Sequence, residues 1–279
     1  MAEAAPARRA LDAAAGDAVS APRERSVRVG GEALRVLELG EGAPLGVLPT
    51  FGGLPRTTPF LERLAARRRV VLPSLPGFAG GGTGFRRLDD LADWVTATLD
   101  LLEASGLDGA DLLGHGVGGM LAAEVAAFSR PTVRRLVLVA PLGLFDEREP
   151  VADVFARRAS EIPALFSTKP AEYAASLACP KGEDEVEWQI GQVRAMEAAA
   201  RLLWPTGDRG LAKRLHRISA KTLLLWGGED RIVPASYAKR FADGLASEAE
   251  VRSIPGAGHR VDFDAPEEAA QAVLRFLAP

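Results

Sequence analysis

One short segment, residues 111–120, constrains the fold of this chain more than any other. An apolar run that favours a strand leads into glycines at alternate positions, Gly114, Gly116 and Gly118. Residues 121–127, Leu-Ala-Ala-Glu-Val-Ala-Ala, favour a helix directly afterwards. Glycine adopts backbone conformations and close backbone contacts that other residues do not. The segment therefore predicts a sharp strand-to-helix turn centred on Gly116.

Segments that favour strands and helices alternate along most of the chain, a pattern typical of an α/β protein with a mostly parallel sheet covered by helices on both faces. The first two strands are expected to form a hairpin, because Gly30-Gly31 between them is a good two-residue turn. Eight strands are expected, over residues 26–29, 33–39, 45–48, 69–72, 110–113, 133–140, 222–226 and 250–254. Besides residues 121–127, helices are expected over residues 59–67, 88–105, 184–204, 235–245 and 265–277, with Gly106 ending the second of these.

The alternation stops between residues 143 and 214, where no run favours a strand. Helical stretches there are broken at Pro150, Pro163, Pro170 and Pro180. An all-helical insertion between core strands predicts a cap over the active site. We therefore divide the chain into a flexible tail (residues 1–25), a core (residues 26–142 and 215–279) and a helical cap (residues 143–214).

Composition excludes several classes of function. A net charge of −3 gives no basic field for nucleic acid, and no stretch approaches the roughly 20 apolar residues of a membrane span. The single cysteine, Cys179, fits a reducing compartment, and the first 25 residues lack the apolar run of a signal peptide, so we expect a cytoplasmic protein. Three histidines without clustered cysteines, and glycine-rich loops without a phosphate-binding motif, predict neither a metal nor a cofactor. The expected partner is a small molecule, and the sequence leaves the oligomeric state open.

Two later segments add an acid and a histidine. Residues 222–234 predict a buried strand that ends in a turn carrying Glu229 and Asp230, and residues 251–259 predict a short strand and a glycine-rich loop that ends in His259. The chain order of turn, acid and histidine is that of the α/β-hydrolases. From about residue 27 to residue 276, the chain resembles that superfamily, and most of all its small bacterial esterases, lactonases and C–C hydrolases with a helical cap.

The resemblance implies roles for particular residues. His259 would accept and return a proton, and Asp230 would orient it, with Asp146 and Glu229 as alternative acids. The superfamily carries its nucleophilic serine where this chain has Gly116, so no acyl-enzyme can form through that position. The backbone N–H groups of Phe51 and Val117 would form the oxyanion hole.

The resemblance also bears on four further residues. A second departure from the superfamily is Pro49-Thr50, where relatives usually have His-Gly. The sequence therefore leaves the shape of the oxyanion hole open. Thr50 adds a hydroxyl near the site and is an alternative nucleophile. His115 corresponds to a histidine that usually packs the turn, and His216 is expected on the surface of a helix.

Three functions are compatible with this site. The chain is a hydrolase of a small, apolar ester, lactone or C–C substrate whose activity is weak or absent without the serine. Alternatively, it is a lyase or cofactor-free oxygenase that uses His259 and Asp230 as a general base, or a non-catalytic protein that binds a small ligand. Retention of both His259 and Asp230 disfavours the last of these.

Overall fold

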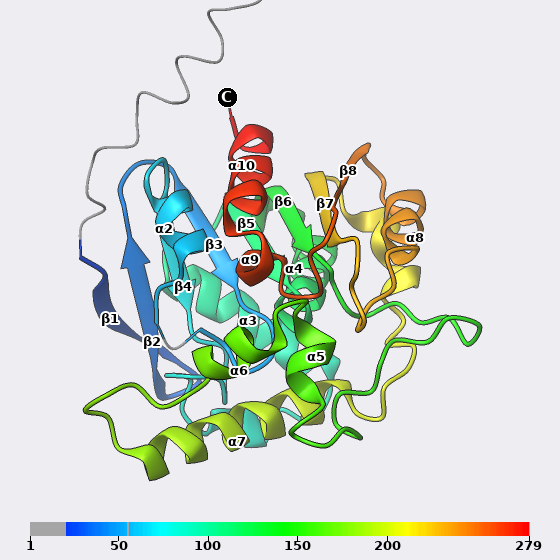
Figure 1. Ribbon diagram of the computed structural model, residues 1–279. Coiled ribbons are helices and arrows are strands. Elements are labelled where there is room, and N and C mark those ends of the chain that lie inside the picture. The colour runs from blue at the N-terminus through cyan, green and yellow to red at the C-terminus, as the bar shows by residue number, and fades with distance from the viewer. Residues whose placement is uncertain (1–20, 55, 279) are drawn as a thin grey trace, which may run out of the picture.

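The computed structural model describes residues 21–54 and 56–278, and its centre is one eight-stranded sheet (Figure 1). The strand order is β1-β2-β4-β3-β5-β6-β7-β8. β2 pairs antiparallel with both β1 and β4, and all other pairs are parallel. The strands are β1 (Arg23–Val29), β2 (Glu32–Leu39), β3 (Pro44–Leu48), β4 (Arg69–Pro73), β5 (Ala110–His115), β6 (Val133–Val139), β7 (Lys221–Gly227) and β8 (Ala249–Ile254). The predicted α/β class, with a mostly parallel sheet of eight strands, is confirmed.

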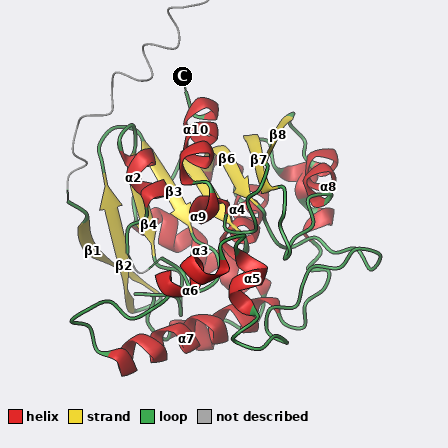
Figure 2. Ribbon diagram, in the orientation of Figure 1, coloured by secondary structure: helices red, strands yellow, loops and turns green. Residues whose placement is uncertain are grey.

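Helices cover both faces of the sheet (Figure 2). The α-helices are α2 (Pro59–Ala65), α3 (Leu91–Ala104), α4 (Val117–Phe128), α5 (Ile162–Phe166), α6 (Pro170–Ser176), α7 (Glu185–Leu203), α8 (Tyr237–Gly244), α9 (Val261–Asp264) and α10 (Pro266–Phe276). Short 3-10 helices are η1 (Gly84–Arg87), η2 (Arg130–Thr132), η3 (Leu211–Lys213) and η4 (Leu215–Arg217).

The first hairpin forms as expected but begins earlier. Gly30 and Gly31 both have positive φ, 56° and 83°, as a tight two-residue hairpin turn requires. Arg23 to Arg25 already pair with β2, so the assignment of these residues to a flexible tail is wrong. The rest of that predicted tail, up to residue 20, lies outside the described residues.

The long helix α3 begins at Leu91 and not at residue 88, because Asp90 caps it. The Asp90 carboxylate accepts a hydrogen bond from the backbone N–H of Asp93 at 3.0 Å. At the other end Gly106 has a φ of 73°, and its N–H donates to the Glu103 carbonyl at 2.9 Å. The predicted stop at Gly106 is therefore confirmed.

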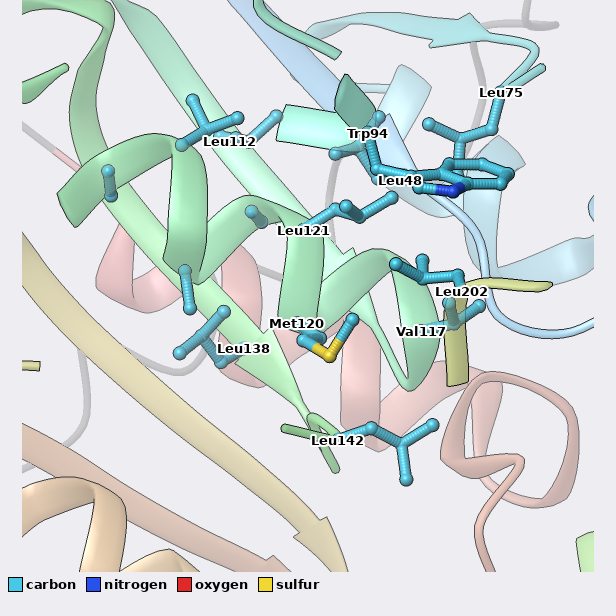
Figure 3. Packing of buried hydrophobic residues seen from close by; sticks show 14 of the residues in the cluster. Leu48, Leu75, Trp94, Leu112, Val117, Met120, Leu121, Leu138, Leu142 and Leu202 are labelled. Carbon is cyan, nitrogen blue, oxygen red and sulfur yellow. The ribbon is translucent and has the colours of Figure 1, made fainter. Parts of the chain in front are cut away.

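The buried apolar side chains form two clusters, one on each face of the sheet. Along the central strands, alternate residues join different clusters: Leu112 packs with α3 and α4, whereas Leu113 packs with α2 and α10. Figure 3 shows Val117, Met120 and Leu121 of α4 among these residues. The helix that follows the glycine-rich turn is thus held on nearly all sides, because every residue from Val117 to Ala127 is buried.

Residues 143–214 contain no strand within the described chain, and their regular elements are helices, the first of which begins at Ile162. Figure 1 shows α5, α6 and α7 together at one end of the sheet. The apolar stripe that helped to predict α7 does not form its buried face, since Val186 and Val193 are 65% and 70% exposed. The buried face consists of residues near the carboxyl end of α7, Ala195, Ala198, Ala199, Leu202 and Leu203.

A buried ion pair joins the end of this helical region to the core. Glu124 of α4 is fully buried, and Arg214, between η3 and η4, donates two hydrogen bonds of 2.6 Å to its carboxylate. This carboxylate holds the pKa of Arg214 above its ordinary value. Removing one partner of such a pair leaves a charge in an apolar environment.

We therefore expect Arg214→Met to lower the free energy of unfolding by about 3 kcal/mol. Urea unfolding followed by circular dichroism measures the change. The matched control is Lys213→Met, which removes an exposed charge one residue away. Replacing both partners, Glu124→Leu with Arg214→Met, should recover much of the loss, and an unchanged midpoint for Arg214→Met alone would contradict the prediction.

Candidate active site

The strand-to-helix turn lies between β5 and α4, with Gly116 as its central residue. Gly116 has φ 54° and ψ −113°, a conformation that is strained for residues with a side chain. Its N–H donates to the Val139 carbonyl at 2.9 Å, and its carbonyl accepts from the Leu142 N–H at 3.0 Å. The turn is therefore fixed against the end of β6, and residue 116 sits at the carboxyl edge of the sheet.

The flanking glycines are required by close backbone contacts. A Cβ atom on Gly114 would overlap the carbonyl oxygen of Gly118, and a Cβ on Gly118 would overlap that of Leu48. Neither contact involves a flexible side chain that could move away. The alternate glycines in the sequence thus reflect how tightly β3, β5 and α4 meet.

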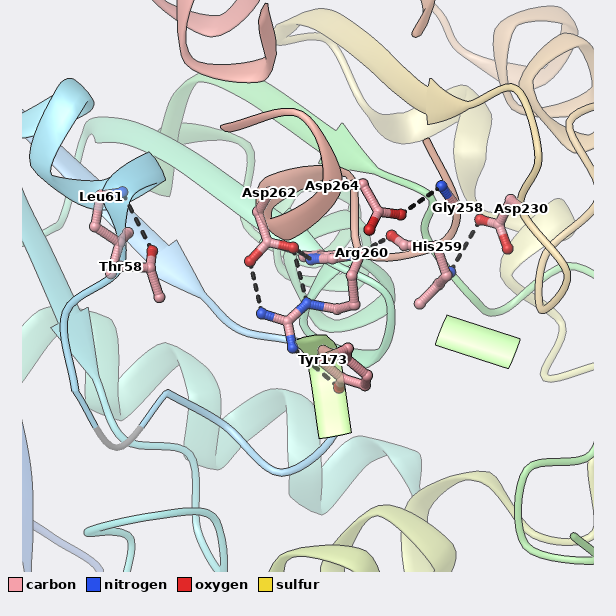
Figure 4. Close-up of polar contacts among 10 residues, drawn as sticks. Thr58, Leu61, Tyr173, Asp230, Gly258, His259, Arg260, Asp262 and Asp264 are labelled. Atoms are coloured by element: carbon pink, nitrogen blue, oxygen red, sulfur yellow. Dashed lines mark hydrogen bonds and ion pairs between the residues drawn. The ribbon is translucent and has the colours of Figure 1, made fainter. Parts of the chain in front are cut away.

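The histidine and the acid lie together beside this turn. His259 Nδ1 is 2.9 Å from Asp230 Oδ2, and both side chains are fully buried (Figure 4). The backbone N–H groups of Ile232 and Val233 donate to Asp230 Oδ1 at 2.8 and 2.9 Å, which fixes the carboxylate. Because a carboxylate only accepts, Nδ1 carries the proton, and Nε2 of the neutral ring has a lone pair for a proton from elsewhere.

The alternative acids occupy other environments. Asp146 forms ion pairs with Arg148 and Arg240, and its pKa is lowered to about 2, chiefly by hydrogen bonds from Arg148. Glu229 is exposed. Of the three acids considered from the sequence, Asp230 is the one whose carboxylate contacts His259.

His259 Nε2 points at the turn. It lies 3.0 Å from the position that a Cβ on Gly116 would occupy, and Thr50 Oγ1 lies closer still to that position. The structure thus brings together Gly116, His259 and Asp230, with Thr50 as a fourth member. Both His259 Nε2 and Thr50 Oγ1 are buried and without a hydrogen-bond partner among the described residues.

The two backbone N–H groups that are predicted to form the oxyanion hole belong to different elements. Phe51 follows β3, and Val117 is the first residue of α4. Within the described chain, neither N–H donates a hydrogen bond to another protein group. The first residues of a helix leave their N–H groups unpaired, which suits binding of a negative oxygen.

His115 packs against His259 and binds the backbone of the loop that carries it. Its Nε2 donates to the His259 carbonyl oxygen at 2.8 Å, and the two rings pack with centroids 5.1 Å apart. Burial lowers the pKa of His115 to about 3, so the ring is neutral near pH 7. His216, expected on a helix surface, is exposed on the 3-10 helix η4.

The residues after His259 form a buried ionic cluster that sequence reasoning missed. Arg260 donates two hydrogen bonds of 2.8 Å to Asp262 and a third of 3.1 Å to the Tyr173 hydroxyl of α6 (Figure 4). Burial raises the pKa of Asp262, but Arg260 more than offsets this and holds it at about 2. The signal in the sequence was the alternating charge of Arg260, Asp262 and Asp264 directly after the histidine.

Asp264 ties the histidine loop to the helical region. Its carboxylate accepts the Gly258 N–H at 2.7 Å, the Thr168 N–H at 3.1 Å and the Ser167 hydroxyl. In addition, the Arg260 N–H donates to the Phe166 carbonyl at 2.8 Å. The segment that follows α5 and the loop that carries His259 are therefore held as one unit.

Aromatic rings cover the His259 side chain. Phe166 packs edge-on against the imidazole with centroids 5.6 Å apart, and Phe51 packs against Phe166 at the same distance. Phe51 also lines a cavity of about 450 Å³, together with Arg56, Trp188 and other residues of the core, α6 and α7. This volume is typical of small-molecule sites.

Two further findings concern the part of the chain that the structure describes. None of its helices is long and apolar enough to cross a membrane. It also contains no group of three or more histidine, cysteine or acidic side chains placed to bind a metal ion.

The burial of His115 predicts a pH dependence of stability. Below about pH 6.5 the unfolded chain binds a proton on this residue, whereas the folded protein does not bind it until about pH 3. The free energy of unfolding should therefore fall by up to about 1.4 kcal/mol for each unit of pH lost between these limits. His115→Asn should show a shallower fall in urea titrations across that window. Parallel curves for the two proteins would contradict the prediction.

Comparison with known proteins places this arrangement in a family. Residues 47–272 match the model of the Alpha/beta hydrolase family. The chain is 32% identical, over 94% of its length and 71% of the relative, to the dihydrolipoyllysine-residue acetyltransferase component of the acetoin cleaving system of Pseudomonas putida. It is 26% identical to the 2-hydroxymuconate semialdehyde hydrolase of Pseudomonas sp. (strain CF600), over 91% of this chain and 93% of the relative.

Solved structures agree on the fold. A meta-cleavage product hydrolase from Pseudomonas fluorescens IP01, complexed with acetates, superposes with a TM-score of 0.73 at 17% identity, covering 90% of this chain and 96% of the other. The strand order, the glycine-rich turn and the matched family therefore lead to one assignment. This chain belongs to the α/β-hydrolase family.

Proposed function

We propose that this protein is a weak hydrolase that cleaves a small, apolar ester, lactone or C–C substrate by general acid–base catalysis, with no covalent intermediate on residue 116. The observation that carries the proposal is the buried His259–Asp230 pair, whose free Nε2 faces the turn at Gly116. Family membership implies a small-molecule substrate. The absence of a side-chain oxygen at residue 116 rules out an acyl-enzyme there.

The reaction needs an oxygen nucleophile other than a residue-116 side chain. In the proposed sequence, His259 Nε2 takes a proton from a water molecule as the water oxygen bonds to the substrate carbonyl carbon. The carbonyl oxygen becomes an oxyanion that accepts hydrogen bonds from the Phe51 and Val117 N–H groups. His259 then returns the proton to the leaving oxygen or carbon as its bond to the carbonyl carbon breaks. Asp230 stabilises the protonated imidazole between these steps.

A low rate follows from this arrangement. Serine hydrolases that lose a member of their triad retain roughly 10³- to 10⁴-fold catalysis over water, from the oxyanion hole and binding alone. Water is also held less firmly than a side-chain nucleophile, so part of the advantage of fixed position is lost.

The cavity beside Phe51 supports a small substrate with an apolar part. Phe51 and Trp188 supply aromatic surface, and the Arg56 guanidinium lies 5.7 Å from the centre of the Trp188 ring. A cation in this position suits a substrate that carries a carboxylate at its far end. The relatives reported above include a hydrolase named for such a compound, 2-hydroxymuconate semialdehyde.

His259→Ala and Asp230→Asn are expected to lower kcat/KM by about 10²- to 10⁴-fold on any substrate that the protein hydrolyses. Initial rates on activated esters, lactones and vinylogous C–C substrates measure the effect, with thermal unfolding to confirm that the variants fold. Glu229→Gln is the matched control, because it removes an exposed carboxylate next to Asp230. Equal rates for His259→Ala and the natural protein would reject the proposal.

A second candidate function is acyl transfer to an organic nucleophile. The complete burial of His259 beneath Phe166 favours it, because bulk water does not contact the imidazole. A thiol acceptor would give up its S–H proton to Nε2 while its sulfur takes the acyl group, and the leaving group would receive that proton. The acetyltransferase named among the relatives gives this candidate a precedent.

The two candidates differ in their products. With an acyl ester and a small dithiol present together, hydrolysis yields the free acid, whereas transfer yields the thioester. Liquid chromatography with mass detection measures the ratio. For a transferase we expect thioester in excess and loss of both products in His259→Ala, and free acid alone would reject this candidate.

A further inference from the structure

Thr50 and Gly116 compete for one volume. Thr50 follows β3 and is only 2% exposed. A Cβ on residue 116 would overlap Thr50 Oγ1 and lie 3.1 Å from Thr50 Cβ. The threonine side chain therefore takes space that a side chain at the turn would need.

The threonine hydroxyl is also one of two unsatisfied polar groups at this point. Thr50 Oγ1 and His259 Nε2 are both buried without a hydrogen-bond partner among the described residues. A buried polar group without a hydrogen-bond partner is destabilising, so two such groups side by side in a native site call for a functional explanation. Here the two atoms flank the same position, since both lie near the Cβ point of Gly116.

The geometry suits one oxygen held between them. The Cβ point is 3.0 Å from His259 Nε2 and closer to Thr50 Oγ1. The distance between His259 Nε2 and Thr50 Oγ1 cannot exceed the sum of their two distances from the Cβ point. Because that sum is shorter than two hydrogen bonds of about 2.8 Å placed end to end, one oxygen can bind both atoms. A hydroxyl both donates and accepts, whereas the neutral Nε2 only accepts. An oxygen between them can accept from Thr50 while it donates its own proton to His259.

We propose that Thr50 is a positioning residue that holds the attacking oxygen against His259 Nε2. This inference rests on the proposed function, in which His259 acts as the general base. A serine at residue 116 would itself be the nucleophile, held in place by the turn. In this chain, a residue on a different loop orients the nucleophile instead. The attacking oxygen belongs to water in hydrolysis and is replaced by the acceptor atom in acyl transfer.

Thr50 itself is a weaker candidate for the nucleophile. A base must lie within hydrogen-bond reach of the proton that it removes. Thr50 Oγ1 makes no such bond to His259 Nε2, although both atoms are free to do so in the described structure. A single intervening oxygen accounts for both unpaired atoms.

The first experiment compares Thr50→Val, which removes the hydroxyl at nearly constant volume, with Thr50→Ser, which keeps it. Thr50→Val should lower kcat about tenfold, the effect of losing one hydrogen bond to the reacting oxygen, while KM changes little. Thr50→Ser should retain most of the rate. The matched control is Thr98→Val, which removes a buried hydroxyl bonded to the Trp94 carbonyl within α3 and should leave kcat unchanged.

The outcomes separate this inference from the proposed function. Full kcat in Thr50→Val, with His259→Ala inactive, overturns the positioning role and keeps the general base. Full rates in both variants, or no turnover by the natural protein, overturn both. An acyl group found on Thr50 by peptide mass spectrometry during turnover identifies it as the nucleophile and also overturns the positioning role.

A second set of variants tests the shared volume and needs no activity from the natural protein. Gly116→Ser alone places its Cβ against Thr50, so it should gain little ester hydrolysis. Thr50→Gly with Gly116→Ser removes the obstacle and should hydrolyse activated esters at least tenfold faster than Gly116→Ser, with an initial burst of one product per enzyme. Equal rates for the single and double variants, both correctly folded, would show that Thr50 does not occupy the space beside residue 116.

Discussion

The candidate site depends on one backbone junction, where the turn at Gly116 meets the ends of β3, β5 and β6. No side chain intervenes there: the Gly116 N–H and carbonyl bind Val139 and Leu142, and a Cβ on Gly118 would overlap the Leu48 carbonyl. Contacts between backbones have no rotamers and little freedom to relax. The junction therefore places the groups from three loops within a few ångströms of one another, whatever side chains those loops carry.

A second layer of interactions fixes the histidine loop. Asp264 receives three hydrogen bonds, two of them from residues that follow α5, and Arg260 bridges Asp262 and Tyr173. Their partners lie on different segments, so the loop cannot shift without breaking bonds to the helical region. Buried charges are costly, and here each charge has a charged or hydrogen-bonding partner. The cost is consistent with a loop whose imidazole must keep its orientation within a narrow range.

Local patterns in the sequence predicted the features that depend on neighbouring residues. The strands, the hairpin at Gly30-Gly31, the stop at Gly106 and the class of the fold follow from periodicity and turn chemistry. The sequence also named Gly116, Asp230 and His259, because their order along the chain has a known spatial meaning in a family. Their roles in catalysis remain predictions until the variants are measured.

Features that depend on tertiary contacts were not predicted. The family resemblance placed the Thr50 hydroxyl near the site, but its overlap with a side chain at residue 116, which lies 66 positions away in the chain, is a tertiary contact that no local pattern reports. The buried face of α7 was also misjudged, because helical spacing shows that Val186 and Val193 share a face but not which face meets the core. The start of α3 moved to Leu91 because the cap at Asp90 outweighs the apolar residue before it.

The shared volume of Thr50 and Gly116 also has a consequence for evolution. A lineage that exchanges a side chain at residue 50 for one at residue 116, or the reverse, must pass through a sequence in which both residues are small. With threonine at residue 50, a substitution at residue 116 alone meets a steric barrier, so the side chains at these two positions are expected to change together.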